Sequence, residues 1–132
     1  MKTWQYILPL IIFSILAGCK NSIDQAKLYG KWKYIKVGHP TAHPPDSVSD
    51  SELKYASPSV EFFRNDQYVI MWSGKVLSHG KFSTEGMSIN ITETMPDSST
   101  REFPFWVTKL TDKTIVFETK GDEKSRVTAI RE

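Results

Sequence analysis

The sequence has one cysteine, no apolar run long enough to span a bilayer, and no strong excess of charge of one sign. Because Cys19 is the only cysteine, an intrachain disulfide framework and a cysteine-rich zinc site are both excluded. The 17 basic and 15 acidic residues are interspersed and give a formal net charge of +2. The basic face of a nucleic-acid-binding protein is therefore not expected.

The composition that remains is that of an ordinary folded domain. The chain has 132 residues, of which 39% are hydrophobic and 24% are charged. These values disfavour disorder, collagen-like repeats and coiled coils. The length allows one hydrophobic core, so a single globular domain is predicted.

The first 18 residues have the pattern of a secretory signal peptide. Lys2 provides a positive start, and residues 6–16 form an uncharged, mostly apolar stretch that we expect to be helical. The alternative is an uncleaved membrane helix. Pro9 and a length below the roughly 18 apolar residues of a spanning helix count against that alternative.

The end of this stretch, Leu16-Ala17-Gly18-Cys19, resembles the bacterial lipobox. This resemblance implies cleavage between Gly18 and Cys19, followed by acylation of Cys19. A triacylated cysteine is a durable membrane anchor, and its sulfur is no longer available as a nucleophile. Residues 19–27 are then the lipidated cysteine and a polar tether.

The tether is also similar to that of Bacteroidetes-type lipoproteins, and this resemblance implies that the protein lies in the cell envelope, anchored to the outer membrane. In such lipoproteins a lysine followed by acidic residues directs export to the cell surface. Here Lys20 is followed by Asn21 and Ser22, so the surface face and the periplasmic face both stay open.

After the tether, short runs rich in β-branched and aromatic residues alternate with turn residues, and helical spacing is missing. Tight connections such as Asn65-Asp66 and Ser73-Gly74 join runs that are neighbours in space. Eight strands are predicted, at residues 29–37, 58–64, 67–72, 76–83, 87–92, 102–110, 114–119 and 124–130.

These runs predict an all-β fold, an eight-stranded antiparallel up-and-down β-barrel. Several of them alternate apolar with polar residues, as strands around a core do. Barrel closure removes the exposed edges that an open sheet leaves. A sandwich of two packed sheets is the competing architecture.

The motif Gly30-Lys31-Trp32 at the start of the first run resembles the Gly-x-Trp signature of lipocalins. Residues 28–132 as a whole are similar to the lipocalin-like domains of Bacteroidetes lipoproteins, which belong to the calycin type of barrel. The resemblance implies that Trp32 plugs one end of the barrel and stacks under an arginine of the last strand. Arg126 is the first choice for that arginine and Arg131 the second.

Aromatic residues make up 12% of the chain and allow two interpretations. They can be core packing, as large aromatic side chains in small barrels usually are. Alternatively, six of them line a pocket for a small hydrophobic ligand. These six are Tyr34, Phe62, Tyr68, Trp72, Phe82 and Phe105. The apolar stretch from Phe103 to Trp106 is a candidate contact patch for an envelope protein.

Metal binding and catalysis have little support in the sequence. His39, His43 and Asp46 lie in the long segment 38–57, but no fourth ligand is evident, so a solvated loop or a lid is expected instead. Ser78 and His79 are neighbours on a strand and point to opposite faces. We expect no enzyme activity, no metal and no cofactor.

The sequence thus predicts a membrane-anchored lipocalin-like lipoprotein that binds a small hydrophobic ligand in the cell envelope. The alternative is an interaction protein, an inhibitor or assembly factor, whose barrel is filled by its own side chains.

Overall fold

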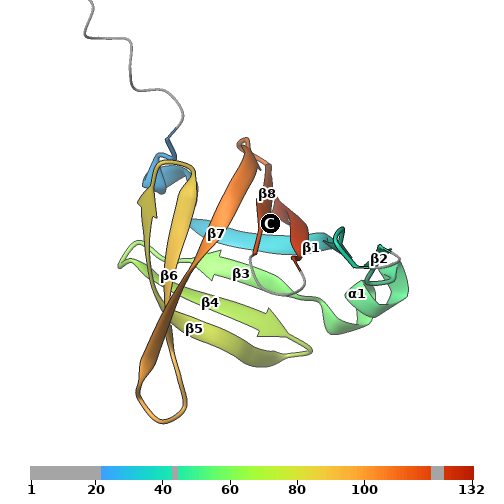
Figure 1. The fold of residues 1–132 in the computed structure, drawn as a ribbon, viewed down its shortest axis with the longest axis horizontal. Coiled ribbons are helices and arrows are strands. Elements are labelled where there is room, and N and C mark those ends of the chain that lie inside the picture. Colours follow the sequence, from blue (N-terminus) through green and yellow to red (C-terminus); the bar gives the residue numbers. More distant parts are fainter. Residues whose placement is uncertain (1–21, 43–44, 120–123) are drawn as a thin grey trace, which may run out of the picture.

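A computed structural model describes residues 22–42, 45–119 and 124–132. These residues form one antiparallel sheet with the strand order β2-β1-β3-β4-β5-β6-β7-β8-β9, which closes because β1 also pairs with β9 (Figure 1). The strands are β1 (Gly30–His39), β2 (Asp46–Ser47), β3 (Ser59–Phe62), β4 (Gln67–Trp72), β5 (Lys75–Glu85), β6 (Ser88–Thr94), β7 (Thr100–Leu110), β8 (Thr114–Glu118) and β9 (Arg126–Arg131).

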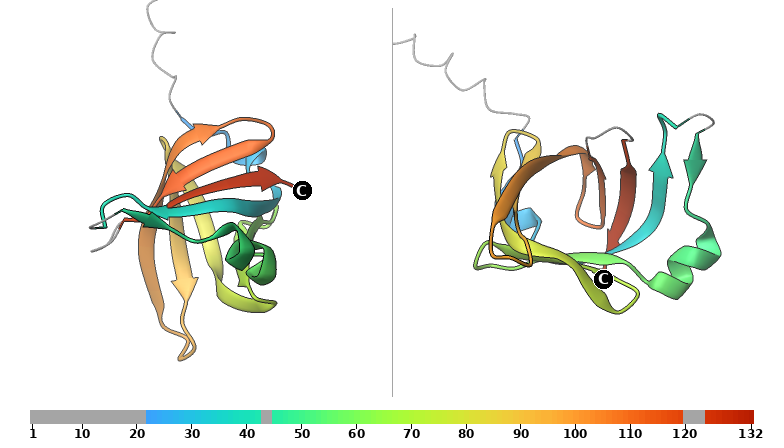
Figure 2. Two further views of the ribbon diagram at one scale, coloured as in Figure 1. Left: turned by 90° about the vertical axis from the view of Figure 1, so that its right-hand side faces the viewer. Right: turned by 60° about the horizontal axis from the view of Figure 1, so that its bottom comes forward.

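The predicted eight-stranded antiparallel barrel is confirmed, and the sandwich is wrong. Strands β1 and β3 to β9 form the ring, and β2 is an extra strand paired to the last two residues of β1, Gly38 and His39. In the view along the barrel, β2 and the helix α1 (Asp50–Ala56) lie outside that ring (Figure 2). The short 3₁₀ helix η3 (Gln25–Lys27) precedes β1.

Tight turns join the consecutive strands, as their residue types predict. Asp66, Gly74 and Gly86 have φ angles of 67°, 76° and 59°, which lie in the left-handed region that Asp and Gly tolerate. Each of these turns links two antiparallel neighbours, and this produces the meander.

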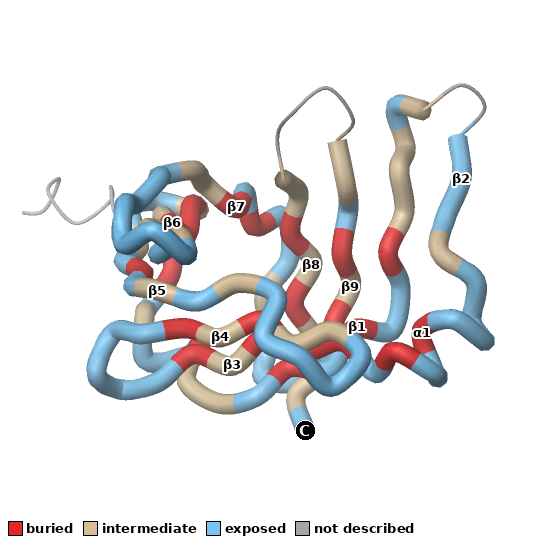
Figure 3. The backbone as a smooth tube through the Cα atoms, turned by 90° about the horizontal axis from the view of Figure 1, so that it is seen from below, coloured by how far each residue is buried: buried red, intermediate tan, exposed pale blue. Residues whose placement is uncertain are grey.

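The core lies inside the ring. Buried residues alternate with intermediate or exposed ones along most of the strands (Figure 3). In β6, for example, Ile89 and Ile91 are fully buried. Each such side chain contributes about 1.5–3 kcal/mol through burial, so the inward face holds the barrel together.

One glycine allows two strands of the barrel to approach closely. A Cβ atom added at Gly80 in β5 would lie 2.0 Å from the backbone oxygen of Thr92 in β6. No side chain fits at that distance. The pairing of Gly80 with Glu93 in the next strand therefore depends on glycine.

The long segment 38–57 differs from the solvated loop that the sequence predicts. It contains β2 and α1, and Leu53 and Ala56 of the helix are buried. The helix begins with Ser49, whose hydroxyl accepts a hydrogen bond from the backbone N–H of Glu52 at 3.2 Å. This is half of a capping box, and it explains why a helix forms here.

Pro104 lies inside β7, where a strand normally needs its N–H groups. The N–H of Val107 donates to the carbonyl of Met87. Because N–H groups alternate in direction along a strand, every second residue of β7, counted back from Val107, points its N–H toward β6, and Pro104 is not one of these residues. The nitrogen of Pro104 therefore points to the other edge of β7, beyond the last β8 residue, Glu118. At that position a proline removes no ladder hydrogen bond.

The described strands and core residues all lie between Ile23 and Arg131. A chain from residue 20 onward therefore contains the whole closed sheet and its core. Because barrel closure leaves no edge that needs an outside partner, we expect this piece to fold on its own.

Candidate ligand-binding site

The end of the barrel next to η3 is sealed by Trp32. Its ring is fully buried, and its indole Nε1–H donates to the carbonyl of Leu28 at 2.9 Å. The guanidinium carbon of Arg131 lies 4.2 Å from the ring centroid, in cation–π contact. Trp32 therefore forms the floor of the barrel.

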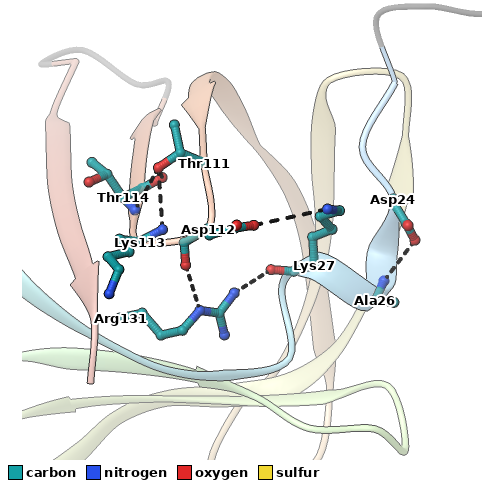
Figure 4. A network of polar contacts seen from close by, with 8 residues as sticks. All are labelled: Asp24, Ala26, Lys27, Thr111, Asp112, Lys113, Thr114 and Arg131. Atoms are coloured by element: carbon teal, nitrogen blue, oxygen red, sulfur yellow. Dashed lines mark hydrogen bonds and ion pairs between the residues drawn. The ribbon is translucent and has the colours of Figure 1, made fainter.

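Arg131 also ties the surrounding backbone together at this closed end. Its Nε–H donates to the carbonyl of Asp112 at 2.9 Å, and its Nη2–H donates to the carbonyl of Lys27 at 2.7 Å (Figure 4). Its Nη1–H donates to the carbonyl of Tyr29. One side chain thus joins η3, the start of β1 and the β7–β8 turn above the tryptophan.

The first-choice partner of Trp32 was wrong, because Arg126 lies on the opposite face of β9. Arg126 pairs with Glu118 on the outer wall, with its Nε 2.8 Å from Oε2 of the carboxylate. This ion pair lowers the pKa of Glu118, mainly through that hydrogen bond. Arg131 is the residue in register with Trp32.

Gly30 makes room for this arrangement. Its φ angle of +123° is one that residues with side chains rarely adopt. A Cβ at this position would lie 2.8 Å from Nη1 of Arg131. The Gly-x-Trp motif and Arg131 are therefore one structural unit, in which the glycine leaves space for the arginine that covers the tryptophan.

The six aromatic residues predicted to line a pocket lie in or against the core. Tyr34, Phe62, Tyr68, Phe82 and Phe105 are buried, and Trp72 is half-buried against the same cluster. Several of these rings touch. The centroids of Phe62 and Phe82 are 4.8 Å apart, and Phe105 stacks on Phe117 at 4.6 Å. Burial raises the pKa of Tyr34 well above its usual range.

A polar row crosses the inner wall beside these aromatic side chains. Tyr68 pairs with Gly80, Gly80 with Glu93, and Glu93 with Arg101, so these residues of β4 to β7 share one face. Nε of Arg101 lies 2.7 Å from Oε1 of Glu93. The Tyr68 hydroxyl is 2.7 Å from that of Ser78.

The pKa of Tyr68 reflects its position in this polar row. Burial raises the pKa of Tyr68, the hydrogen bond between the Tyr68 and Ser78 hydroxyls lowers it, the charge of Glu93 raises it and that of Arg101 lowers it. Glu93 is only 8% exposed, which is rare for a carboxylate. A buried carboxylate on the inward face of the barrel, paired with an exposed arginine, is the most unusual chemical feature among the described residues.

Sequence reasoning missed this row, although a signal was present. Met87, Ile89 and Ile91 alternate on one face of β6, and the next position in that alternation is Glu93. A charged residue that continues an apolar face predicts a buried charge that needs a partner. The partner comes from β7, at a position that only the register shows.

The predicted contact patch at residues 103–106 is divided between the two faces of β7. Phe103 and Phe105 pack on the core, whereas Trp106 is 41% exposed on the outer wall. Trp106 and Pro104 line an open groove of about 580 Å³ on the outside of β5 to β7. The other lining side chains of that groove are mostly polar, such as Asn90 and Thr92.

Other predicted positions are placed as follows. His39 ends β1, and its Nδ1 lies 3.3 Å from the Ser125 hydroxyl. His43, and also Gly18 and Cys19, fall outside the described residues. Within the described ranges, no group of three or more His, Cys, Asp or Glu side chains is arranged to hold a metal ion. In the same part of the chain, no helix combines the length and apolarity needed to cross a bilayer.

The closed β-barrel, with its tryptophan floor beneath a covering arginine, defines a lipocalin-like fold. Among solved structures, the chain is similar to a lipocalin-like protein from Bacteroides uniformis ATCC 8492, with a TM-score of 0.57 and 16% sequence identity. The alignment covers 80% of this chain and 99% of the other. No protein-family model and no curated protein matches the sequence.

Proposed function

We propose that this chain is a lipid-anchored lipocalin-like lipoprotein of the outer membrane that binds a small hydrophobic ligand inside its barrel. The observation that carries the proposal is that the two ends of the barrel differ. Trp32 and Arg131 seal one end, whereas the inner wall away from that end carries aromatic side chains and the Glu93–Arg101 pair. Eight-stranded barrels can hold one small ligand, and the end away from Trp32 is the side from which a ligand would enter.

Native mass spectrometry of residues 20–132, followed by organic extraction, tests ligand carriage. We expect a co-purifying apolar mass that is lost in Trp72→Glu, because Trp72 packs against the core. Trp106→Glu is the matched control, since Trp106 lies on the outer wall and should retain the mass. Circular dichroism establishes that both variants are folded. Loss of the mass in the control alone would contradict the proposal.

The second candidate is an envelope interaction protein with a filled barrel. The ring contacts between Phe62 and Phe82 and between Phe105 and Phe117 favour it, as does the outer groove lined by Trp106. A clean mass of the chain alone, unchanged after incubation with fatty acids, haem and bile acids, would support this candidate. Neither proposal assigns a catalytic step to the chain.

The anchor is tested separately through Cys19. Because acylation needs the cysteine sulfur, Cys19→Ala should accumulate as an uncleaved precursor that takes up no labelled palmitate. The unchanged chain should be shortened and labelled. A variant that is still cleaved and labelled would show that the anchor lies elsewhere.

A further inference from the structure

The two members of the inner-wall ion pair differ strongly in exposure. The Glu93 side chain is 11% exposed, whereas that of Arg101 is 64% exposed. The carboxylate of Glu93 is therefore shielded from solvent, and the guanidinium of Arg101 faces it. An approaching molecule meets the arginine first.

Within the guanidinium of Arg101, only Nε forms a hydrogen bond to a described residue. Nε–H donates to Glu93, and the guanidinium carbon lies 5.4 Å from the centroid of Phe103. Among the described residues, no hydrogen-bond partner is found for its terminal nitrogens Nη1 and Nη2. These two nitrogens present parallel N–H groups, the geometry that binds a carboxylate or phosphate.

Apolar surface begins directly beside this group. Phe103 packs against the core below Arg101, and its ring centroid is 5.8 Å from that of Phe105. Phe105 in turn stacks on Phe117. The inward face thus changes from a cation on β7 to packed aromatic side chains on β7 and β8, which matches a molecule with one charged end and one apolar end.

We propose that Arg101 binds the anionic head group, a carboxylate or a phosphate, of an amphiphilic ligand whose apolar part lies against Phe103 and Phe105. This inference rests on the proposed function, because it names the class of ligand that the barrel takes. Glu93 already accepts a hydrogen bond from Arg101 and is shielded from solvent, so a cationic head group is disfavoured.

Titration calorimetry with four amphiphiles of equal chain length tests this assignment on residues 20–132. The probes are dodecanoate, dodecyl phosphate, dodecanol and dodecyltrimethylammonium, the ionic ones below their micelle concentrations and dodecanol below its solubility limit. At least one of the two anions should bind about tenfold more tightly than dodecanol, the effect of one charge-assisted hydrogen bond. Which anion binds more tightly distinguishes a fatty-acid-type head from a phosphate-type head.

Two variants assign the effect to Arg101. Arg101→Gln should reduce the affinity for the anion to that for dodecanol and leave dodecanol binding unchanged. Arg126→Gln is the matched control, because Arg126 forms the same kind of cross-strand pair with Glu118 on the outer wall. This control should keep the preference for the anion.

Other outcomes separate this inference from the proposed function. Equal binding of the anions and dodecanol, or an anion preference that survives Arg101→Gln, would overturn the role of Arg101 and leave ligand binding intact. Tighter binding of the cationic probe would assign the head-group contact to Glu93 instead. If none of the four probes binds, this inference is overturned, and the proposed function fails as well only if native mass spectrometry also finds no bound ligand.

Discussion

At the level of single residues, the closed end depends on a few side chains that touch each other. Trp32 was identified from the Gly-x-Trp motif, but its partner could not be chosen from the motif. The alternation of β9 contains the answer, because Val127 and Ala129 are buried and the next inward position is Arg131, not Arg126. The sequence can identify Arg131 as the partner of Trp32 only if it is known which face of β9 points into the barrel.

Arg131→Gln is expected to destabilise the barrel by about 3 kcal/mol, because it removes a cation–π contact and charge-assisted hydrogen bonds to three carbonyl groups. Arg126→Gln should cost less than about 1 kcal/mol, since its ion pair is partly exposed. Urea unfolding followed by tryptophan fluorescence measures both values. Equal losses in the two variants would contradict the structural role of Arg131.

At the level of elements, the sequence predicted the strands of the barrel well and predicted segment 38–57 poorly. Strand positions follow from alternation and turn residues, and both of these signals are local. The helix α1 is seven residues long, too short for its periodicity to be visible. Ser49 and Glu52 have the spacing of a capping box and could have indicated the start of a helix. The surrounding segment, however, has the residue types of a loop.

The pairing of β5 with β6 supplies a prediction at this scale. Gly80→Ala should destabilise the barrel by about 3 kcal/mol, because the new Cβ would overlap the Thr92 carbonyl and push the two strands apart. Gly38→Ala is the control, since a Cβ there meets its nearest backbone oxygen, that of Asp46, at an ordinary 3.8 Å. The measurement is the urea midpoint of each variant. A stable Gly80→Ala variant would mean that the strands are not so close.

At the level of the whole molecule, the closed barrel could be predicted, but the arrangement of its interior could not. Alternation shows which residues face inward, yet the meeting of Glu93 with Arg101 depends on the register of β6 against β7. Five of the six predicted pocket residues are buried, and several of their rings touch one another. The proposed function therefore requires that a ligand enter between these rings and the polar row.

Methyl NMR of residues 20–132 with dodecanoate tests this claim most directly. Ile91 and Val107 report on the inner wall, and Val76 and Ile130 report on exposed positions. If the ligand lies inside the barrel, chemical-shift changes and intermolecular contacts will appear at Ile91 and Val107 and not at Val76 and Ile130. Changes confined to the exposed methyl groups, with the inner ones unmoved at saturation, would contradict the account.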